Sequence, residues 1–366
     1  MPAVNKFNYC LALVCSIGFA ITQEILANDR TSTIAINPAG NLIAVVNNDS
    51  RSVTLVDLPG HAIQAEIMVG RDPRNVAFSH DGSLAVVTNR WNDSLSVIDV
   101  SSLVVEKTVE LCDEPAGVLA MDDGRVFVSC QGAGQIAVVD PAMGTVVGLV
   151  EVNSAPNGMA YDRARNLLYV THFIDGMVSV IDPDSLLVLN IISTGADSNL
   201  VNGIVIGPDG NRAWIPHERS NVGDTAILFD TTVFPVVTSI DLNKQAQVFS
   251  ERIHLDISDE PVNMPFDAVV TQDKLIWVLN SGSNDLSVVD LETQTGIAHI
   301  EVGHNPRGLA RSADGSSIYV NNNLSGSVSV VDTASRAVTE EFQVTEIALT
   351  RGVLNGKRLF HSCLLY

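Results

Sequence analysis

LAVVTNRWNDSLSVID, residues 84–99, is the stretch that decides the fold, because the chain repeats it at regular intervals. Related stretches are VFVSCQGAGQIAVVD (126–140), LLYVTHFIDGMVSVID (167–182) and SIYVNNNLSGSVSVVD (317–332). The aspartates that close the repeats are Asp57, Asp99, Asp140, Asp182, Asp230, Asp290 and Asp332. They are separated by 42, 41, 42, 48, 60 and 42 residues, so the chain contains seven units, with insertions in the fifth and sixth.

Each unit consists of four short runs rich in β-branched residues. In the second unit the runs are 75–79, 84–88, 95–99 and 104–111. The turn between the first two runs ends on a glycine, which supplies the positive φ of a tight hairpin; these glycines are Gly82, Gly124, Gly210 and Gly315. Four antiparallel strands in about 40 residues are typical of a propeller blade. The sequence therefore predicts an all-β, seven-bladed β-propeller over residues 31–346.

Composition limits the possible partners. The chain has 366 residues and a formal net charge of −21, with no basic run anywhere. Binding to a phosphate backbone depends on a basic surface, so we expect no nucleic-acid partner. Apolar residues make up 46% of the chain, which is enough for a large core.

Residues 1–27 have the features of a signal peptide. Lys6 gives a thin positive n-region, residues 9–21 are apolar, and small residues offer cleavage after Ala20 or Ala27. A membrane anchor would need roughly 20 apolar residues, and this run ends earlier. We expect export to the periplasm or secretion, with no membrane span after cleavage.

The cysteines predict neither a disulfide framework nor a haem. After signal cleavage Cys112, Cys130 and Cys363 remain, so at most one pair can form, and the sequence leaves open whether Cys112 and Cys130 pair. The chain has no CxxC and hence no CxxCH, so we expect no covalent haem and no cofactor.

Two resemblances follow from these residues. The second run of each unit is similar to the YVTN-type propeller repeat, as in Tyr169-Val170-Thr171-His172 and Tyr319-Val320-Asn321-Asn322. The stretches IPHERSN (215–221), FDTTVFPVV (229–237), PVNMPFD (261–267) and GKRLFHS (356–362) resemble exported propellers fused to a c-type cytochrome domain of the di-haem peroxidase kind. That resemblance implies that residues 347–366 are a tail that begins a missing cytochrome domain, and we expect this tail to lie loosely against the propeller.

The repeat alignment also indicates which residues lie at the channel mouth. At the position that leads into the innermost strand, the seven units have Ser32, Arg74, Ala116, Asn157, Asn202, Phe266 and Arg307. Arg74 and Arg307, together with Arg71 and His304, predict a cationic patch that binds an anion, because arginine chelates carboxylates. The alternative is that each arginine braces its own blade by pairing with a local carboxylate such as Asp72.

The last residue of the YVTN-like tetrad is a possible ligand in three neighbouring units. Across the units it is Asn47, Asn89, Cys130, His172, His217, Asn280 and Asn322. Cys130, His172 and His217 are weak metal candidates, since second strands of neighbouring blades diverge and a metal needs donors at about 2.0 to 2.3 Å. The alternative is that His and Asn alike hydrogen-bond a connecting loop.

The densest set of ionisable groups is His217, Glu218 and Arg219, predicted to lie in a long loop that ends at Asp230. An acid, a base and an anion clamp side by side would suit a lactonase-like hydrolysis. The insertion 241–266 is interpreted as an acidic surface segment.

Together these observations predict an exported, non-catalytic scaffold. The face with Arg71, Arg74, His172, His217, Arg219, His304 and Arg307 would bind a protein partner or a small anion. By resemblance, the partner would be a periplasmic redox protein or c-type cytochrome. A lactonase-like hydrolase and a surface-layer or adhesion module are the alternatives.

Overall fold

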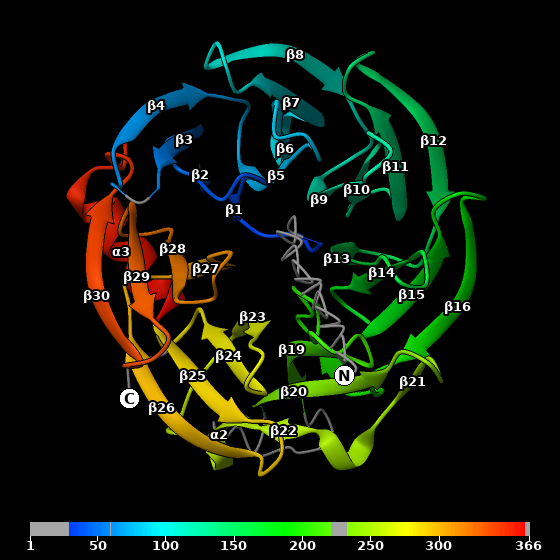
Figure 1. Cartoon of the computed structure of the whole chain (residues 1–366), viewed down its shortest axis with the longest axis vertical. Coiled ribbons are helices and arrows are strands. Elements are labelled where there is room, and N and C mark those ends of the chain that lie inside the picture. Colours follow the sequence, from blue (N-terminus) through cyan, green and yellow to red (C-terminus); the bar gives the residue numbers. More distant parts are fainter. Residues whose placement is uncertain (1–28, 59, 221–232, 363–366) are drawn as a thin grey trace, which may run out of the picture.

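Seven antiparallel sheets form a ring around a central axis (Figure 1). This computed structural model describes residues 29–58, 60–220 and 233–362. Each sheet takes its strands from one continuous segment of the chain, and the first strand of each sheet lies nearest the axis. The predicted seven-bladed propeller is confirmed. Among the described residues, no helix is both long and apolar enough to cross a bilayer.

Six blades have four strands in simple up-and-down order. Blades 1 and 2 are β1 (Ile34–Ile36), β2 (Leu42–Asn47), β3 (Ser52–Asp57), β4 (Ile63–Met68), β5 (Pro73–Phe78), β6 (Leu84–Asn89), β7 (Ser94–Asp99) and β8 (Val104–Glu110). Blades 3 and 4 are β9 (Pro115–Ala120), β10 (Val126–Cys130), β11 (Gln135–Asp140), β12 (Thr145–Glu151), β13 (Pro156–Asp162), β14 (Leu167–His172), β15 (Met177–Asp182) and β16 (Leu187–Ser193). Blades 6 and 7 are β23 (Pro265–Val270), β24 (Leu275–Asn280), β25 (Asp285–Asp290), β26 (Thr295–Glu301), β27 (Pro306–Arg311), β28 (Ser317–Asn322), β29 (Ser327–Asp332) and β30 (Ala337–Gln343).

Blade 5 is irregular, and its register differs from the predicted one. Its inner strand is split into β17 (Ser198–Asn199) and β18 (Val205–Ile206), and both pieces pair with β19 (Arg212–Ser220). The third strand is β20 (Val233–Asp241), so Asp241 closes this unit, whereas the predicted Asp230 lies outside the described residues. The Asp241 carboxylate accepts hydrogen bonds from the N–H groups of Asn243 and Lys244, as other closing aspartates do in their turns.

The insertion 241–266 is more than a surface segment. It supplies β21 (Ala246–Gln247), η2 (Phe249–Glu251), β22 (Ile253–His254) and α2 (Leu255–Ser258). β21 and β22 both pair with β20 and form the outer edge of blade 5. Ile253, Leu255 and Val262 are buried between blades 5 and 6, which corrects the surface interpretation.

Apolar side chains fill the space between blades. Seven clusters of buried residues occur, and each combines two neighbouring blades, including blades 7 and 1. The second and third strands are almost wholly buried, as in β2, because both of their faces pack on neighbouring blades. Outer strands such as β8 alternate between exposed and less exposed residues, because one face meets solvent.

Close approach of the inner strands explains two glycines. A Cβ on Gly117 would lie 2.4 Å from the carbonyl oxygen of Asn157, and one on Gly158 would lie 2.2 Å from that of Asn202. No side chain fits at such a distance. The hairpin glycines behave as predicted, with positive φ at Gly82 and its three counterparts.

The segment after blade 7 contacts both blades at the ring closure. Val344 is buried there, and its carbonyl accepts a hydrogen bond from Thr54 of blade 1 at 2.8 Å. Helix α3 (Arg351–His361) follows and buries none of its side chains. Lys357 pairs with Asp49 of blade 1, and Arg358 donates to the carbonyl of Leu324 in blade 7 at 2.8 and 3.0 Å. Residues 351–361 of the expected tail thus form a helix that polar contacts attach to the propeller.

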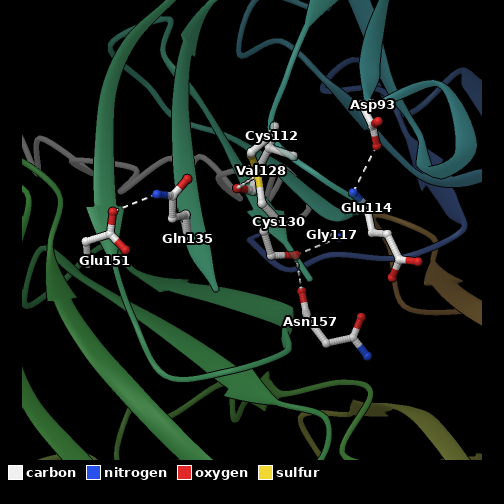
Figure 2. Close-up of a disulfide and its surroundings, with 10 residues drawn as sticks. Asp93, Cys112, Glu114, Gly117, Val128, Cys130, Gln135, Glu151 and Asn157 are labelled. Atoms are coloured by element: carbon white, nitrogen blue, oxygen red, sulfur yellow. Dashed lines mark hydrogen bonds between the residues drawn. A yellow bond between two sulfur atoms is a disulfide. The ribbon is translucent and has the colours of Figure 1, made fainter. Parts of the chain in front are cut away.

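A disulfide joins Cys112 to Cys130 and replaces a hydrogen bond that other blades use (Figure 2). In blade 2, the Asn89 amide oxygen accepts from the N–H of Gly70, and its nitrogen donates to Ser94 and Ser96. Asn322 bonds Gly303 and two serines in the same way. Cys112 occupies the position of those glycines and Cys130 that of the asparagines.

Steric fit explains why a disulfide can replace the glycine–asparagine pair. A Cβ on Gly70 would lie 2.5 Å from Cγ of Asn89, so asparagine and glycine fit only together. Two cysteines with Cα atoms 5.7 Å apart span the same gap covalently.

We predict that the noncovalent pair can be rebuilt in blade 3. Cys112→Ala with Cys130→Ala removes a cross-link over 18 residues and should cost about 3 kcal/mol in the free energy of unfolding. Cys112→Gly, Cys130→Asn and Ala137→Ser together should recover about 1 kcal/mol of this loss, because the introduced asparagine gains the equivalents of the bonds that Asn89 makes to Gly70 and Ser96. Gln135 stands where blade 2 has Ser94, so the third bond is not rebuilt. Urea unfolding measures both values. A triple variant no more stable than the alanine pair would contradict this equivalence.

Candidate functional site

In six blades a loop with one strained residue precedes the inner strand and places a side chain at the channel. In five blades the residue before the inner-strand proline has a positive φ of 50–53°; these residues are Asp72, Glu114, Ala155, Met264 and Asn305. Blade 5 has Leu200 at this position, with a φ of 53°. Such a conformation costs on the order of 1 kcal/mol per non-glycine residue. In all six blades the residue two positions further along the chain lines the channel mouth.

Backbone hydrogen bonds hold each strained residue in place. The carbonyl of Asp72 accepts from the N–H of Arg90 at 3.1 Å, and that of Asn305 accepts from Asn323 at 3.2 Å. Glu114, Ala155 and Met264 repeat this bond with the residue that follows the second strand of their own blade. The end of the second strand therefore fixes the loop that carries the channel residue.

The inward residues line a cavity of about 780 Å³ at the channel mouth. The lower tier is the set of residues that the repeat alignment predicts: Arg74, Ala116, Asn157, Asn202, Phe266 and Arg307. The upper tier is the set of residues one position after the YVTN-like tetrad: Asn48, Arg90, Gln131, Phe173 and Asn323. The cavity size suits a small organic molecule rather than a single ion.

Arg307 is the central cation of the lower tier. Its guanidinium carbon lies 4.7 Å from the centre of the Phe266 ring, and its Nε donates to the side chain of Asn305 at 2.9 Å. Burial, and secondarily the nearby Arg74 guanidinium, lower the pKa of Arg307 to about 10. Within the described ranges it has no carboxylate partner.

Arg74 is already paired. Its Nε and Nη2 lie 3.0 and 2.9 Å from one carboxylate oxygen of Asp72 in the same loop. Burial lowers the pKa of Arg74, and Asp72 opposes this shift. Arg74 thus partly fulfils the bracing alternative, while Arg307 does not.

The cavity lining is cationic in an acidic protein. It contains six Lys or Arg residues, Arg51, Arg71, Arg74, Arg90, Arg307 and Lys357, against three carboxylates, Asp49, Asp72 and Glu114. Each carboxylate forms one ion pair, with Lys357, Arg74 and Arg90 respectively. Across the described part of the chain, Arg51, Arg71 and Arg307 form none. The cavity therefore favours a negatively charged ligand.

The N-terminal segment crosses the base of the channel. Asp29 and Thr31 bond the backbone of β13 in blade 4, and Ser32 accepts from Val76 in blade 2. Arg30 pairs with Asp267 and donates to the carbonyl of Leu309. Thr31 and Ser32 line a narrow space of about 40 Å³ below Arg307 and Phe266. Ser32, predicted for the mouth, therefore lies at the base.

The other predicted anion ligands are dispersed. Arg71 lines the cavity rim, with its guanidinium 5.7 Å from the Trp91 ring. His304 is exposed near the rim but is not part of the lining. Arg219 pairs with Asp197 outside the cavity.

His172 and His217 are buried structural residues. His172 contacts the carbonyl of Ser154 and the hydroxyl of Ser179 at 3.1 and 2.8 Å. His217 contacts the carbonyl of Glu218 and the hydroxyl of Thr238 at 2.9 and 2.8 Å, and burial lowers its pKa to about 4. Both nitrogens of each ring are occupied, and neither ring lines the cavity. His172 links the loop before the inner strand to the third strand, as Asn89 does in blade 2, whereas His217 links the third strand to its own strand β19.

The metal and hydrolase arrangements do not form. Cys130 forms a disulfide with Cys112, so it cannot be a thiolate ligand. Among the described residues, no group of three potential ligands comes together. His217, Glu218 and Arg219 lie on strand β19 rather than in a loop, where successive side chains point to opposite faces.

Glu218 is a buried carboxyl with one unsatisfied oxygen. One oxygen accepts from the N–H of Met264 at 2.7 Å, and the other has no partner in the described structure. Burial raises the pKa of Glu218 to about 7, and Asp256 adds to this shift. Glu218 occupies the upper-tier position of blade 5 but turns towards the strained loop of blade 6.

Sequence reasoning missed the upper tier and helix α3. The upper tier follows from the same repeat alignment, moved by one residue, so its signal was present. Lys357 and His361 of α3 also line the cavity. Nothing in the repeat predicts them, because α3 lies outside the seven units.

Comparisons with known proteins identify the fold. No protein-family model matches the sequence, and no curated protein matches it. The structure is similar to that of "Kuenenia stuttgartiensis Hydrazine Synthase", with a TM-score of 0.77 and 20% identity over 89% of this chain and 99% of that chain. It is also similar to "Dihydro-heme d1 dehydrogenase NirN in complex with DHE", with a TM-score of 0.58 and 18% identity over 87% of this chain and 67% of that chain.

We predict that Glu218 makes the protein less stable as pH rises. A carboxyl whose pKa is raised on folding favours the folded state below its unfolded pKa, and this advantage is lost as pH rises through 7. Between pH 5 and 8 the loss should be roughly 2 kcal/mol. His217 acts oppositely over this range, because its pKa is lowered on folding.

Glu218→Gln separates the two effects, since it keeps His217 and the bond from Met264. The difference in unfolding free energy between wild type and Glu218→Gln should therefore shift by roughly 2 kcal/mol from pH 5 to pH 8. Urea unfolding at both values measures it. A difference that stays constant with pH would contradict the assignment.

Proposed function

We propose that this protein is an exported β-propeller scaffold that binds a small anionic ligand at its channel mouth. The observation that carries the proposal is Arg307, a cation deep in the cavity with no carboxylate partner among the described residues. Arg74 would share the ligand by giving up part of its bond to Asp72. An anion between them would offset the repulsion between the two guanidinium groups.

We propose further that the scaffold is of the YVTN-repeat type and serves a periplasmic redox system that includes a c-type cytochrome. The resemblance to propeller and cytochrome fusions supports this link, and the name of one structural neighbour includes dihydro-heme d1. Export is supported by the signal features of residues 1–27 and by the Cys112–Cys130 disulfide, since disulfides persist in oxidising compartments. The lactonase alternative is disfavoured, because both nitrogens of the His217 ring are engaged outside the cavity.

We predict that Arg74→Gln with Arg307→Gln weakens anion binding without unfolding the protein. The affinity for citrate, measured by calorimetry at low ionic strength, should fall at least about tenfold, because two charge-assisted contacts are lost. The midpoint of thermal unfolding should change by only a few degrees, because Arg307 has no carboxylate partner among the described residues and removing both charges relieves the repulsion between the two guanidinium groups.

Lys244→Gln with Lys274→Gln is the matched control. It removes the same charge from two exposed residues outside the cavity. Equal losses of affinity in the two double variants would mean a general charge effect. Unchanged binding with a large loss of stability in the arginine variant would favour bracing.

A further inference from the structure

Helix α3 forms one wall of the cavity. Lys357 and His361 line it together with the propeller residues, and Leu349 lines it just before the helix. In Figure 1 the helix lies beside blade 7. The cavity is therefore built from the ring and from a segment outside the repeats.

Cationic groups converge between this wall and the lower tier. Burial lowers the pKa of His361, and the charges of Arg307 and Lys357 add to the shift. The charge of Arg74 in turn contributes to the lowered pKa of Arg307. Helix α3 itself carries Arg351, Lys357, Arg358 and His361 and no Asp or Glu. Arg307 and Lys357 are therefore the cations on the two sides of this space, and His361, whose pKa is lowered, offers a ring N–H as a hydrogen-bond donor.

The helix is held in a way that allows exchange of partners. None of its side chains is buried, and the Lys357 ion pair with Asp49 and the Arg358 bonds to Leu324 attach it to the ring. A ligand carboxylate near Asp49 would compete with Asp49 for Lys357 at little cost, since partly exposed ion pairs contribute about 0–1 kcal/mol.

The cavity also has flat apolar surfaces beside these charges. One face of the Arg307 guanidinium packs on Phe266. Phe173, Trp91 and Leu324 supply further apolar surface. A planar guanidinium stacks on an aromatic ring as well as pairing with a carboxylate, which a lysine cannot do.

We propose that the ligand is an aromatic polycarboxylate, a flat ring system with two or more carboxylates, held between Arg307 at the floor and Lys357 and His361 of α3. This inference rests on the proposed anion-binding function and specifies its ligand. Inorganic phosphate has no apolar surface and would occupy a small part of about 780 Å³. Citrate supplies three carboxylates but no ring, so comparing its affinity with that of an aromatic tricarboxylate distinguishes the contribution of charge from that of ring stacking.

The test is calorimetric titration of the full chain with five probes: benzene-1,3,5-tricarboxylate, 2,6-naphthalenedicarboxylate, citrate, inorganic phosphate and a hexaglutamate peptide. Benzene-1,3,5-tricarboxylate should bind at least about tenfold more tightly than citrate, because ring stacking adds to the same charge. Lys357→Gln with His361→Gln should weaken it by about tenfold. Arg351→Gln, on the same helix but outside the lining, is the control and should change its affinity less than about twofold.

The outcomes separate this inference from the function on which it rests. Citrate or phosphate binding as tightly as the aromatic probes would overturn the aromatic assignment and leave anion binding intact. An unchanged affinity in the α3 double variant would remove α3 from the site. Tighter binding of a hexaglutamate peptide than of either aromatic probe would overturn the inference in favour of an acidic protein partner. If no probe binds at low ionic strength, the proposed function itself fails.

Discussion

The contact between blade 7 and blade 1 is the constraint on which the whole ring depends. Each blade is one continuous segment, so no strand crosses from the last blade into the first and packing must close the ring. The closing cluster combines residues such as Ile34 and Tyr319, and Asn321 of blade 7 bonds Thr33 and the carbonyl of Val46 in blade 1. Val344 adds to this cluster from the segment that leads to α3. Closure and the position of α3 at the cavity are thus physically linked.

A second dependence joins the strained loops to the site. Six lead-in loops hold a non-glycine residue at positive φ, at a total cost of several kcal/mol by the usual figure for such strain. A blade could reach its inner strand through glycine without that cost. These loops lead directly into the residues of the lower tier, which a rigid ring rather than a mobile loop holds against the axis. Arg307 and Phe266 are held in stacking contact by two such loops from neighbouring blades.

The sequence predicts the ring and the lower tier because equivalent positions of the repeat occupy equivalent places in the blades. Residues at the same position of the repeat lie at similar distances from the ring axis and at similar levels along it. The alignment could therefore place Arg74 and Arg307 on the same face before any contact was known. Predictions from repeat position fail where the chain departs from the repeat. In blade 5, Asp230 and Asp241 each follow an apolar residue, and only the strand pairing of β20 identifies Asp241 as the closing residue. Lys357 lies outside the repeat, so no repeat argument could give its contact with Asp49. The Cys112–Cys130 pair, in contrast, occupies the glycine and asparagine positions that bond to each other in blades 2 and 7.

The repeat also places a set of carboxylates far from the cavity. Aspartates of the hairpin turns, such as Asp81, Asp99 and Asp332, lie at the end of the blades opposite the cavity, and hydrogen bonds from serines lower the pKa of each. These carboxylates stay charged and account for part of the net charge of −21. At physiological ionic strength the Debye length is about 8 Å, so a ligand at the mouth is largely screened from them. An anion in the cavity would lie directly against the arginines that line it, and this short-range attraction would be screened much less. An acidic propeller can therefore present an anion site where cations locally outnumber carboxylates, as six do against three in the cavity lining.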